Sequence, residues 1–282
     1  MQLLAHGGAG SDPDEPAPRQ ERLDRAIAAG VDASQPEGAV IATVRELETS
    51  PRFNAGVGSA VQSDGVVRTD AGLMRSDGTT GAACSMPGVE HAVDVAHVVA
   101  TETPHILVSG EHALALADAF DVATDCDLRT ERTRERWEKV EPPETADVHE
   151  HLAWVREQFG GSDTVGAVAR DGDRLAAATS TGGRWAAIAG RVGDVPQVGS
   201  GFYTTEHAAV SATGAGEAIA RFGLSRWVAD AIEDGAEPAT ATERGIEAFE
   251  EATDDVAGVI AVDSAGRMGE AFNSNSMQTS RQ

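Results

Sequence analysis

A predicted β-hairpin at residues 164–181 constrains the fold of this chain more than any other stretch. Its sequence, TVGAVARDGDRLAAATST, has two runs of small, mostly apolar residues on either side of an Asp171-Gly172-Asp173 turn. Short runs of this kind around an Asp-Gly turn are typical of paired antiparallel strands. We therefore expect a hairpin of buried strands, in a core that packs closely through small side chains.

Helix-like and strand-like patterns alternate along both halves of the chain. Apolar residues make up 41% of the 282 positions and are mainly Ala and Val, which suits an α/β protein with a multilayer core. We expect a first strand in LLAHGGAG that runs into a glycine turn at 6–10, and further strands in HILVSG and AAVSAT. We also expect a meander in 52–78 with turns at 64–65 and 77–78, and a closing hairpin in 256–272. The expected helices are near 19–33, 38–48, 91–102, 110–120, 215–234 and 240–252.

A charged segment at residues 122–160 interrupts this alternation. It includes DLRTERTRERWEKVEPPETADVHEH, with the pair Pro142-Pro143, and has little strand character. We expect one helix there, followed by a mobile linker at about 138–160. The whole order fits either two domains or one layered domain whose central sheets receive strands from both halves.

The strongly acidic composition argues against a nucleic-acid partner. The net charge is −24, from 46 acidic and 22 basic residues, and Lys139 is the one lysine. Nothing in the sequence could neutralise phosphates over an extended face. The scattered acids favour a halophilic protein from a salt-accumulating organism, with an acidic mesophilic protein as the alternative.

Neither the cysteines nor the N-terminal sequence predicts an exported or membrane protein. Cys84 and Cys126 lack the spacing of a zinc site or a disulfide framework. The start, MQLLAHGGAG, has no basic region, and no apolar run of about 18 residues occurs. We expect a cytoplasmic protein that does not bind membranes.

Several common catalytic and nucleotide-binding motifs are absent. The glycine clusters complete no phosphate loop, because Lys139 is far from any of them. The eight histidines show no metal spacing, no GxSxG elbow accompanies them, and His6 is expected to serve in a turn. Residues 213–216 are of interest, because a strand that runs into a helix start presents backbone N–H groups to a developing oxyanion.

A threonine at a chain N-terminus would supply both a nucleophile and its base. Its α-amino group, with an ordinary pKa of about 7.7–8.0, can accept the hydroxyl proton near neutral pH. The chain must then be cut just before the threonine. GGSDTVGAV offers such a place, since Thr164 Oγ could attack the Asp163 carbonyl and leave an ester for water to cleave. The alternative is structural: Asp turns the chain and Thr is a good strand former.

Six motifs, taken together and in order, resemble one enzyme family. They are HGGAG at 6–10, RFNAG at 52–56, SDTVGAV at 162–168, AATSTGG at 177–183, GRVGD at 190–194 and ATGAGE at 212–217. The set resembles the plant-type asparaginases and isoaspartyl peptidases, which are N-terminal nucleophile hydrolases of the threonine type. The resemblance implies one domain over 1–282, a four-layer α/β/β/α sandwich. It also implies an inactive precursor that cuts itself into an α chain (1–163) and a β chain (164–282).

The resemblance assigns catalytic roles to residues of these motifs. Thr164 would be the nucleophile, and Thr181 would hydrogen-bond it and assist self-cleavage. Thr213, through its hydroxyl, and Gly214, through its backbone N–H, would form the oxyanion hole, and Asn54 would lie against the nucleophile. Without the resemblance, Thr181 also fits a strand-end hydroxyl that caps a loop, and Asn54 fits an Asn-Ala-Gly turn.

The same resemblance assigns substrate binding to Arg191 and Asp194. A substrate with a free α-carboxylate and a free α-ammonium needs one fixed cation and one fixed anion, and arginine's fork suits the carboxylate. The Gly183 carbonyl would also receive the ammonium, and Gly214 and Gly216 would lie against the substrate. The alternative for Arg191 and Asp194 is an ion pair that stabilises a loop.

The implied activity is hydrolysis of L-asparagine, and of β-aspartyl dipeptides, without a cofactor. One alternative is a glycosylasparaginase-like amidase, the branch that Asp163 resembles, and another is a poorly cleaving precursor with a binding or structural role. The resemblance also implies a homodimer of precursors that matures to an (αβ)2 heterotetramer. A sodium ion could lie at the backbone of Leu47, Glu48, Phe53, Ala55 and Val57.

Overall fold

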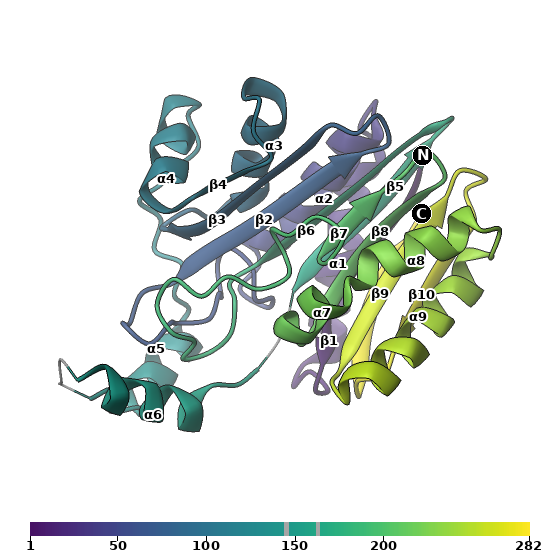
Figure 1. Ribbon diagram of the computed structural model, residues 1–282. Helices are drawn as coiled ribbons and strands as arrows, with labels where there is room; N and C mark the ends of the chain where they lie inside the picture. The colour runs from purple at the N-terminus through teal and green to yellow at the C-terminus, as the bar shows by residue number, and fades with distance from the viewer. Residues whose placement is uncertain (144–146, 162–163) are drawn as a thin grey trace.

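Two β-sheets stacked on each other form the middle of the molecule, and helices cover their outer faces (Figure 1). The computed structural model describes residues 1–143, 147–161 and 164–282. The larger sheet has the strand order β11-β1-β5-β6-β2-β3-β4, and the smaller has the order β10-β9-β8-β7. The larger sheet therefore takes strands from both halves of the chain.

The strands of the larger sheet are β1 (Gln2–Gly10), β2 (Arg68–Arg75), β3 (Thr80–Pro87), β4 (Leu107–Ser109), β5 (Val165–Asp171), β6 (Arg174–Thr181) and β11 (Ser276–Arg281). Those of the smaller sheet are β7 (Phe202–Thr204), β8 (Ala208–Gly214), β9 (Ala257–Asp263) and β10 (Met268–Phe272). Helices α1 (Pro16–Val31), α2 (Pro36–Thr49), α3 (Ala92–Glu102) and α4 (Gly110–Ala119) pack on the larger sheet. Helices α7 (Gly216–Phe222), α8 (Leu224–Glu233) and α9 (Pro238–Thr253) pack on the smaller one.

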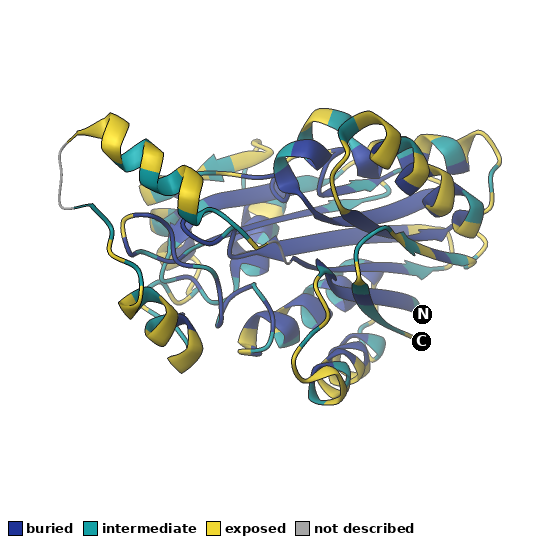
Figure 2. Ribbon diagram, turned by 90° about the horizontal axis from the view of Figure 1, so that it is seen from below, coloured by how far each residue is buried: buried dark blue, intermediate teal, exposed yellow. Residues whose placement is uncertain are grey.

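Three apolar layers hold this α/β/β/α sandwich together, as Figure 2 shows by the dark blue sheets at its centre. One layer joins α1–α4 to the larger sheet, and another joins α7–α9 to the smaller sheet. Between the sheets lie Leu4, Val168, Phe202, Ile260 and other buried side chains. Since alanines and valines dominate the two outer layers and supply half of the buried side chains between the sheets, the backbones approach closely, as the composition predicted.

The hairpin β5–β6 occupies the centre of the larger sheet, as the sequence predicted. Val165 pairs with Ser180 and Asp171 with Arg174, with the turn between them. On its two sides, β5 pairs with β1 and β6 pairs with β2. The start of β5 is therefore held from both sides.

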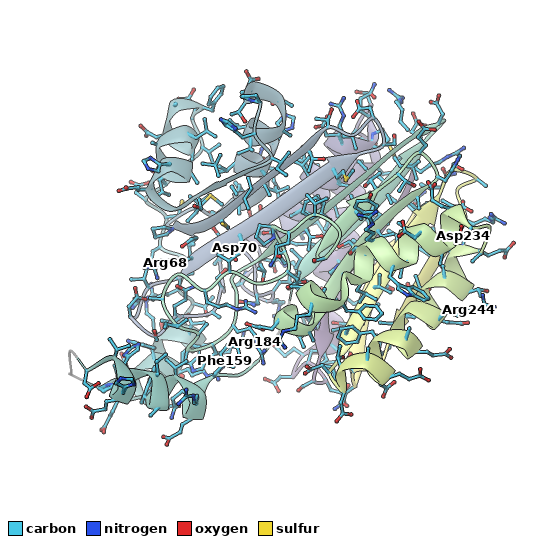
Figure 3. The ribbon with its side chains drawn as sticks, viewed as in Figure 1. Arg68, Asp70, Phe159, Arg184, Asp234 and Arg244 are labelled. Carbon is cyan, nitrogen blue, oxygen red and sulfur yellow. The ribbon has the colours of Figure 1, made fainter. Side chains whose placement is uncertain are left out.

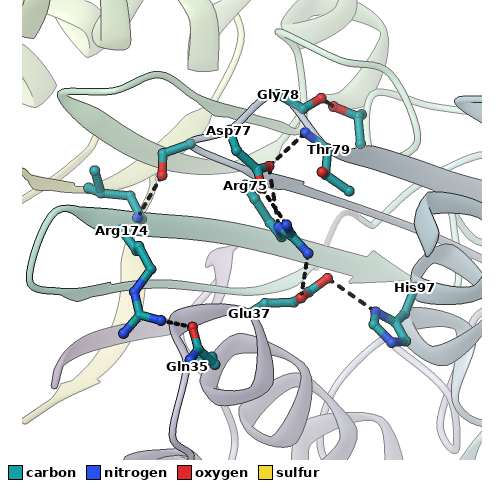
Figure 4. Close-up of polar contacts among 11 residues, drawn as sticks. Gln35, Glu37, Arg75, Asp77, Gly78, Thr79, His97 and Arg174 are labelled. Carbon is teal, nitrogen blue, oxygen red and sulfur yellow. Dashed lines mark hydrogen bonds and ion pairs between the residues drawn. The ribbon is translucent and has the colours of Figure 1, made fainter.

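A polar network joins the β2–β3 turn to the helices behind it (Figure 4). Arg75 pairs with Asp77 in the turn and, at 3.1 Å, with Glu37 of α2. His97 of α3 lies 3.2 Å from the other Glu37 oxygen. The hydrogen bond from His97 and the charge of Arg75 lower the pKa of Glu37. This cluster fixes the helices to the sheet.

Several elements differ from the sequence expectations. The expected helix over 215–234 is broken at Gly223, whose φ of +75° ends α7 and starts α8. The segment 52–67 has only an isolated bridge between Val61 and Val67, and the expected glycine turn in 6–10 is part of β1. Strands β7 and β11 were not predicted. Both are short, and the polar sequence of β11 carries little strand signal.

The charged segment holds two helices instead of the one expected. They are α5 (Glu131–Glu138) and α6 (Val148–Gln158), which lie at one end of the sandwich (Figure 1). Trp137 of α5 makes edge-to-face contacts with Trp185 and with Trp154 of α6, at centroid distances of 6.1 and 6.4 Å. The linker expected at about 138–160 therefore includes a helix. Within the described residues, no helix is long and apolar enough to cross a membrane.

Candidate functional site

Thr164 lies directly before β5, at the end of the sandwich where several predicted residues meet. Its side chain is buried, with 5% of the residue exposed. Because Val165 pairs with Ser180, Thr164 and Thr181 lie at the same end of two adjacent strands. The Thr181 hydroxyl accepts a hydrogen bond from the Gly183 N–H at 3.1 Å. The hairpin thus brings the two threonines to one place.

A small pocket, here called the nucleophile pocket, opens beside these threonines. Seven of the residues predicted for catalysis or substrate binding line it, together with Arg184, which was not predicted. The lining residues are Thr164, Thr181, Gly183, Arg184, Arg191, Asp194, Gly214 and Gly216. They come from the β5–β6 hairpin, the loop after β6 and the junction of β8 with α7. Motifs that are far apart in the sequence therefore meet in one pocket.

Arg191 and Asp194 each leave one buried polar atom without a hydrogen-bond partner. These atoms are Arg191 Nη2 and Asp194 Oδ2. The other side of the Arg191 guanidinium is occupied, since its Nε donates to Glu217 at 2.8 Å. An unsatisfied buried polar atom is costly, so these two atoms are suited to a ligand that carries both an anion and a cation.

Gly216 is what allows these two side chains to approach the helix start. A Cβ at this position would lie 2.5 Å from Asp194 Oδ1 and 2.9 Å from Arg191 Nη2. Any larger residue would push the carboxylate and the guanidinium apart. Gly216 of the ATGAGE motif is therefore required at this pocket for steric reasons.

Burial controls the protonation of the carboxyl groups around Arg191. It raises the pKa of Asp194 to about 6 and that of Asp70 to about 7, against the opposing effects of Arg191 and backbone N–H groups. Burial also acts to raise the pKa of Glu217, but the hydrogen bond and charge of Arg191 outweigh it and hold this pKa at about 2. One guanidinium thus faces three carboxyl groups, of which Glu217 is firmly ionised.

Two predicted residues do not line the nucleophile pocket. Thr213 is fully buried in β8, and its hydroxyl oxygen accepts a hydrogen bond from the Ala9 N–H at 3.2 Å. Asn54 donates to the Gly183 carbonyl at 2.6 Å and accepts from the Ala60 N–H at 2.8 Å. It lines a larger neighbouring cavity of about 1020 Å³, here called the outer cavity. The two cavities share Gly183 and Arg184.

His6 is not in a turn, contrary to the sequence expectation. It is fully buried in β1, and its Nε2 lies 2.9 Å from the Ser211 hydroxyl of the facing sheet. Burial lowers its pKa to about 3, while the Thr164 backbone opposes this shift. A neutral imidazole therefore packs between the sheets, behind the threonine.

Comparison with known proteins agrees with this geometry. The model of a protein family described as asparaginase matches residues 1–282. The chain belongs to the asparaginase family. It is 34% identical to the plant-type L-asparaginase of Pyrococcus abyssi over 98% of this chain and 94% of that protein. It is 37% identical to the isoaspartyl peptidase/L-asparaginase of Danio rerio, over 98% of this chain and 90% of the relative. The two-sheet sandwich is the fold of this family.

Three charged residues near the pocket were missed by the sequence reasoning. Asp70, which is labelled in Figure 3, lies opposite Thr181 in the β2–β6 pairing. Glu217 ends the ATGAGE motif and pairs with Arg191 and Arg184, at 2.8 and 3.4 Å. Arg184 also lies over the Phe159 ring, 4.0 Å from its centroid (Figure 3). The position of Glu217 in a motif was a usable signal, whereas Asp70 required the strand register.

The predicted cation and cleavage residues remain predictions. At the expected cation loop, the Glu48 carbonyl accepts a hydrogen bond from the Val57 N–H at 2.7 Å. Among the described residues, no group of three or more His, Cys, Asp or Glu side chains could hold a metal ion. Asp163, on the other side of the expected cleavage bond, lies outside the described residues.

Proposed function

We propose that this chain hydrolyses L-asparagine to aspartate and ammonia, and also cleaves β-aspartyl dipeptides. One observation carries the proposal: Thr164 shares a small pocket with the unpaired atoms of Arg191 and Asp194. Both substrates present an α-carboxylate, an α-ammonium and a side-chain carbonyl on a short carbon chain. The names of the relatives, L-asparaginase and isoaspartyl peptidase/L-asparaginase, support the same two substrates.

Arg191 and Asp194 would hold the two charged groups of the substrate. The Arg191 guanidinium binds the α-carboxylate, since its Nη2 faces the pocket without a partner. Asp194 binds the α-ammonium, assisted by the Gly183 carbonyl. Gly214 and Gly216 leave room for the substrate backbone. Two fixed charges of opposite sign orient the side-chain carbonyl toward Thr164.

Thr164 would act after the chain has been cut before it. The cut between Asp163 and Thr164 gives a 1–163 α chain and a 164–282 β chain and frees the amine of Thr164. This amine accepts the hydroxyl proton while Oγ attacks the substrate's side-chain carbonyl. Ammonia or the peptide amine leaves, and water resolves the β-aspartyl ester. Thr181, in the pocket beside Thr164, would assist the cleavage and orient the hydroxyl.

The developing oxyanion would be stabilised by Gly214 N–H and the Thr213 hydroxyl. Thr213 can still donate its proton, because its oxygen accepts from Ala9. Asn54 would fix the Gly183 carbonyl at the pocket edge, through the hydrogen bond of 2.6 Å. A sodium ion at the carbonyls of 47–57 and an (αβ)2 assembly belong to the same proposal, as do cytoplasmic and halophilic character.

Replacement of Thr164 tests the proposed function directly. Thr164→Ala should abolish ammonia release from asparagine and release of aspartate from β-Asp-Leu, because nucleophile and base are lost together. Thr101→Ala, a change at an exposed helix position, is the matched control and should leave both rates unchanged. Turnover by a purified Thr164→Ala protein would refute the mechanism.

A further inference from the structure

The outer cavity has a charge opposite to that of the rest of the protein. Six of the arginines of this chain line it, whereas its carboxylates are Asp12, Asp14 and Glu15. The whole chain carries a net charge of −24. The arginines are Arg19, Arg22, Arg52, Arg132, Arg136 and Arg184. A concave site that is basic in an acidic molecule attracts anions and keeps them near.

Several of these arginines already have ion-pair or hydrogen-bond partners within the protein. Arg52 pairs with Glu15 at 2.7 Å, and Arg184 pairs with Glu217. Arg19 is buried over the Phe53 ring and donates to the Gly7 carbonyl. These side chains shape the cavity wall.

Like Arg22 of α1, Arg132 and Arg136 form no ion pair with a carboxylate in the described part of the chain. They stand one turn apart on α5, so they point to the same side of the helix. Arg136 lies over the Trp185 ring, with its guanidinium carbon 3.9 Å from the ring centroid, and this contact holds the side chain in place. Burial and the like charge of Arg132 lower the pKa of Arg136. Two neighbouring like charges without a carboxylate partner are suited to a bound carboxylate.

The outer cavity begins where the nucleophile pocket ends. Both are lined by Gly183 and Arg184, and Asn54 of the outer cavity bonds to the Gly183 carbonyl. A substrate held by Arg191 and Asp194 has its scissile carbonyl at Thr164. The group that leaves from this carbonyl must point out of the pocket, and ammonia is too small to reach the arginines of α5.

We propose that the outer cavity binds the leaving half of β-aspartyl peptides and favours a leaving residue with an acidic side chain. This inference rests on the proposed function and adds the class of peptide that the enzyme prefers. Arg132 and Arg136 act as specificity residues that contact the leaving carboxylates. They take no part in the chemistry at Thr164.

Rates for three substrates with the cleaved enzyme test this inference. The substrates are β-Asp-Glu, β-Asp-Gln and asparagine. The two peptides have the same shape and differ in one charge, so kcat/KM should be about fivefold higher for β-Asp-Glu, the size expected for a partly solvated ion pair. The double variant R132Q/R136Q, which keeps a polar but uncharged end on a shorter stem, should reduce this ratio to about one, with asparagine turnover unchanged.

Arg134→Gln is the matched control on the same helix. Arg134 pairs with Asp127 and does not line the outer cavity, so the variant should keep the preference for β-Asp-Glu. Equal rates for the two peptides in the wild-type enzyme, or a preference that survives in R132Q/R136Q, would overturn the assignment. Asparagine turnover without turnover of either peptide would overturn it as well, and would leave the asparaginase activity standing. No turnover of any of the three would refute the proposed function itself.

Discussion

The nucleophile pocket and the outer cavity both use arginine, but they hold it in opposite ways. Arg191 in the nucleophile pocket has a side chain that is 10% exposed and is surrounded by three carboxyl groups. Arg132 and Arg136 in the outer cavity are exposed and face no carboxylate among the described residues. A buried charge is costly to leave unpaired, whereas a solvated charge is not. The first site therefore selects one arrangement of charges, and the second tolerates many leaving groups and favours anionic ones.

Among these variants, replacement of Arg191 in the nucleophile pocket should cause the largest loss of activity. Arg191→Ala removes the group for the α-carboxylate, which asparagine and β-aspartyl peptides share. We expect kcat/KM to fall by roughly a hundredfold to a thousandfold for both substrates, because a buried charge pair is broken. Self-cleavage should proceed, since the variant leaves Thr164 and Thr181 in place. Steady-state kinetics beside gel analysis of the two chains measures both effects.

Arg226→Ala serves as the control for Arg191. Arg226 is exposed on α8 and pairs with Asp230 at 3.6 Å. Its loss should leave the kinetics unchanged. Loss of self-cleavage in Arg191→Ala would mean that this arginine holds the fold, contrary to the assignment.

Removal of the charge from a buried carboxyl group should have a smaller effect, which is on thermal stability. Removal of the charge from a solvated carboxyl group should have none. The pKa of Asp70 is raised to about 7, so the folded state holds its proton more tightly than the unfolded state. Stability from this group is therefore present at low pH and is lost as the pH rises toward 7. Asp70→Asn keeps the acceptor for the Ser85 N–H and removes the charge. We expect its melting temperature to exceed that of the wild type by about 3 °C at pH 8, with no difference at pH 4.

Asp12→Asn is the matched change in the outer cavity. Asp12 is exposed there, so its replacement should leave the melting temperature unchanged at both pH values. If Asp70→Asn and the wild type melt at the same temperature at pH 8, burial does not disfavour the ionised form of Asp70. Thermal unfolding followed by circular dichroism distinguishes these results.

The nucleophile pocket was largely predictable from the sequence because its residues lie in short, dense motifs. Thr164, Thr181, Arg191 and Asp194 each stand in a glycine-rich stretch, the two threonines at strand ends and the other two residues in the loop after β6. Asp70 has no motif of its own, and it reaches the site through its pairing with Thr181 across two strands. Local pattern carries no information about such a register.

The outer cavity could not be predicted, because it is assembled from distant segments. Arg22 belongs to α1, Arg52 to the loop after α2 and Arg136 to α5. In the sequence, arginines at these positions are typical of solvated helix faces. The same limit applies to the fold. The β5–β6 hairpin was visible in a local pattern, whereas β11 forms by pairing with β1 at the other end of the chain.

In the proposed mechanism, Thr164 becomes an N-terminus and this event creates the enzyme. Intact mass spectrometry of the purified protein, with ammonia release from asparagine measured on the same samples, tests it most directly. We predict two chains, one that ends at Asp163 and one that begins at Thr164. The rate of ammonia release should rise in proportion to the fraction of protein that has been cut. A chain that stays uncut at 29.2 kDa and still releases ammonia would show that Thr164 does not need a free amine.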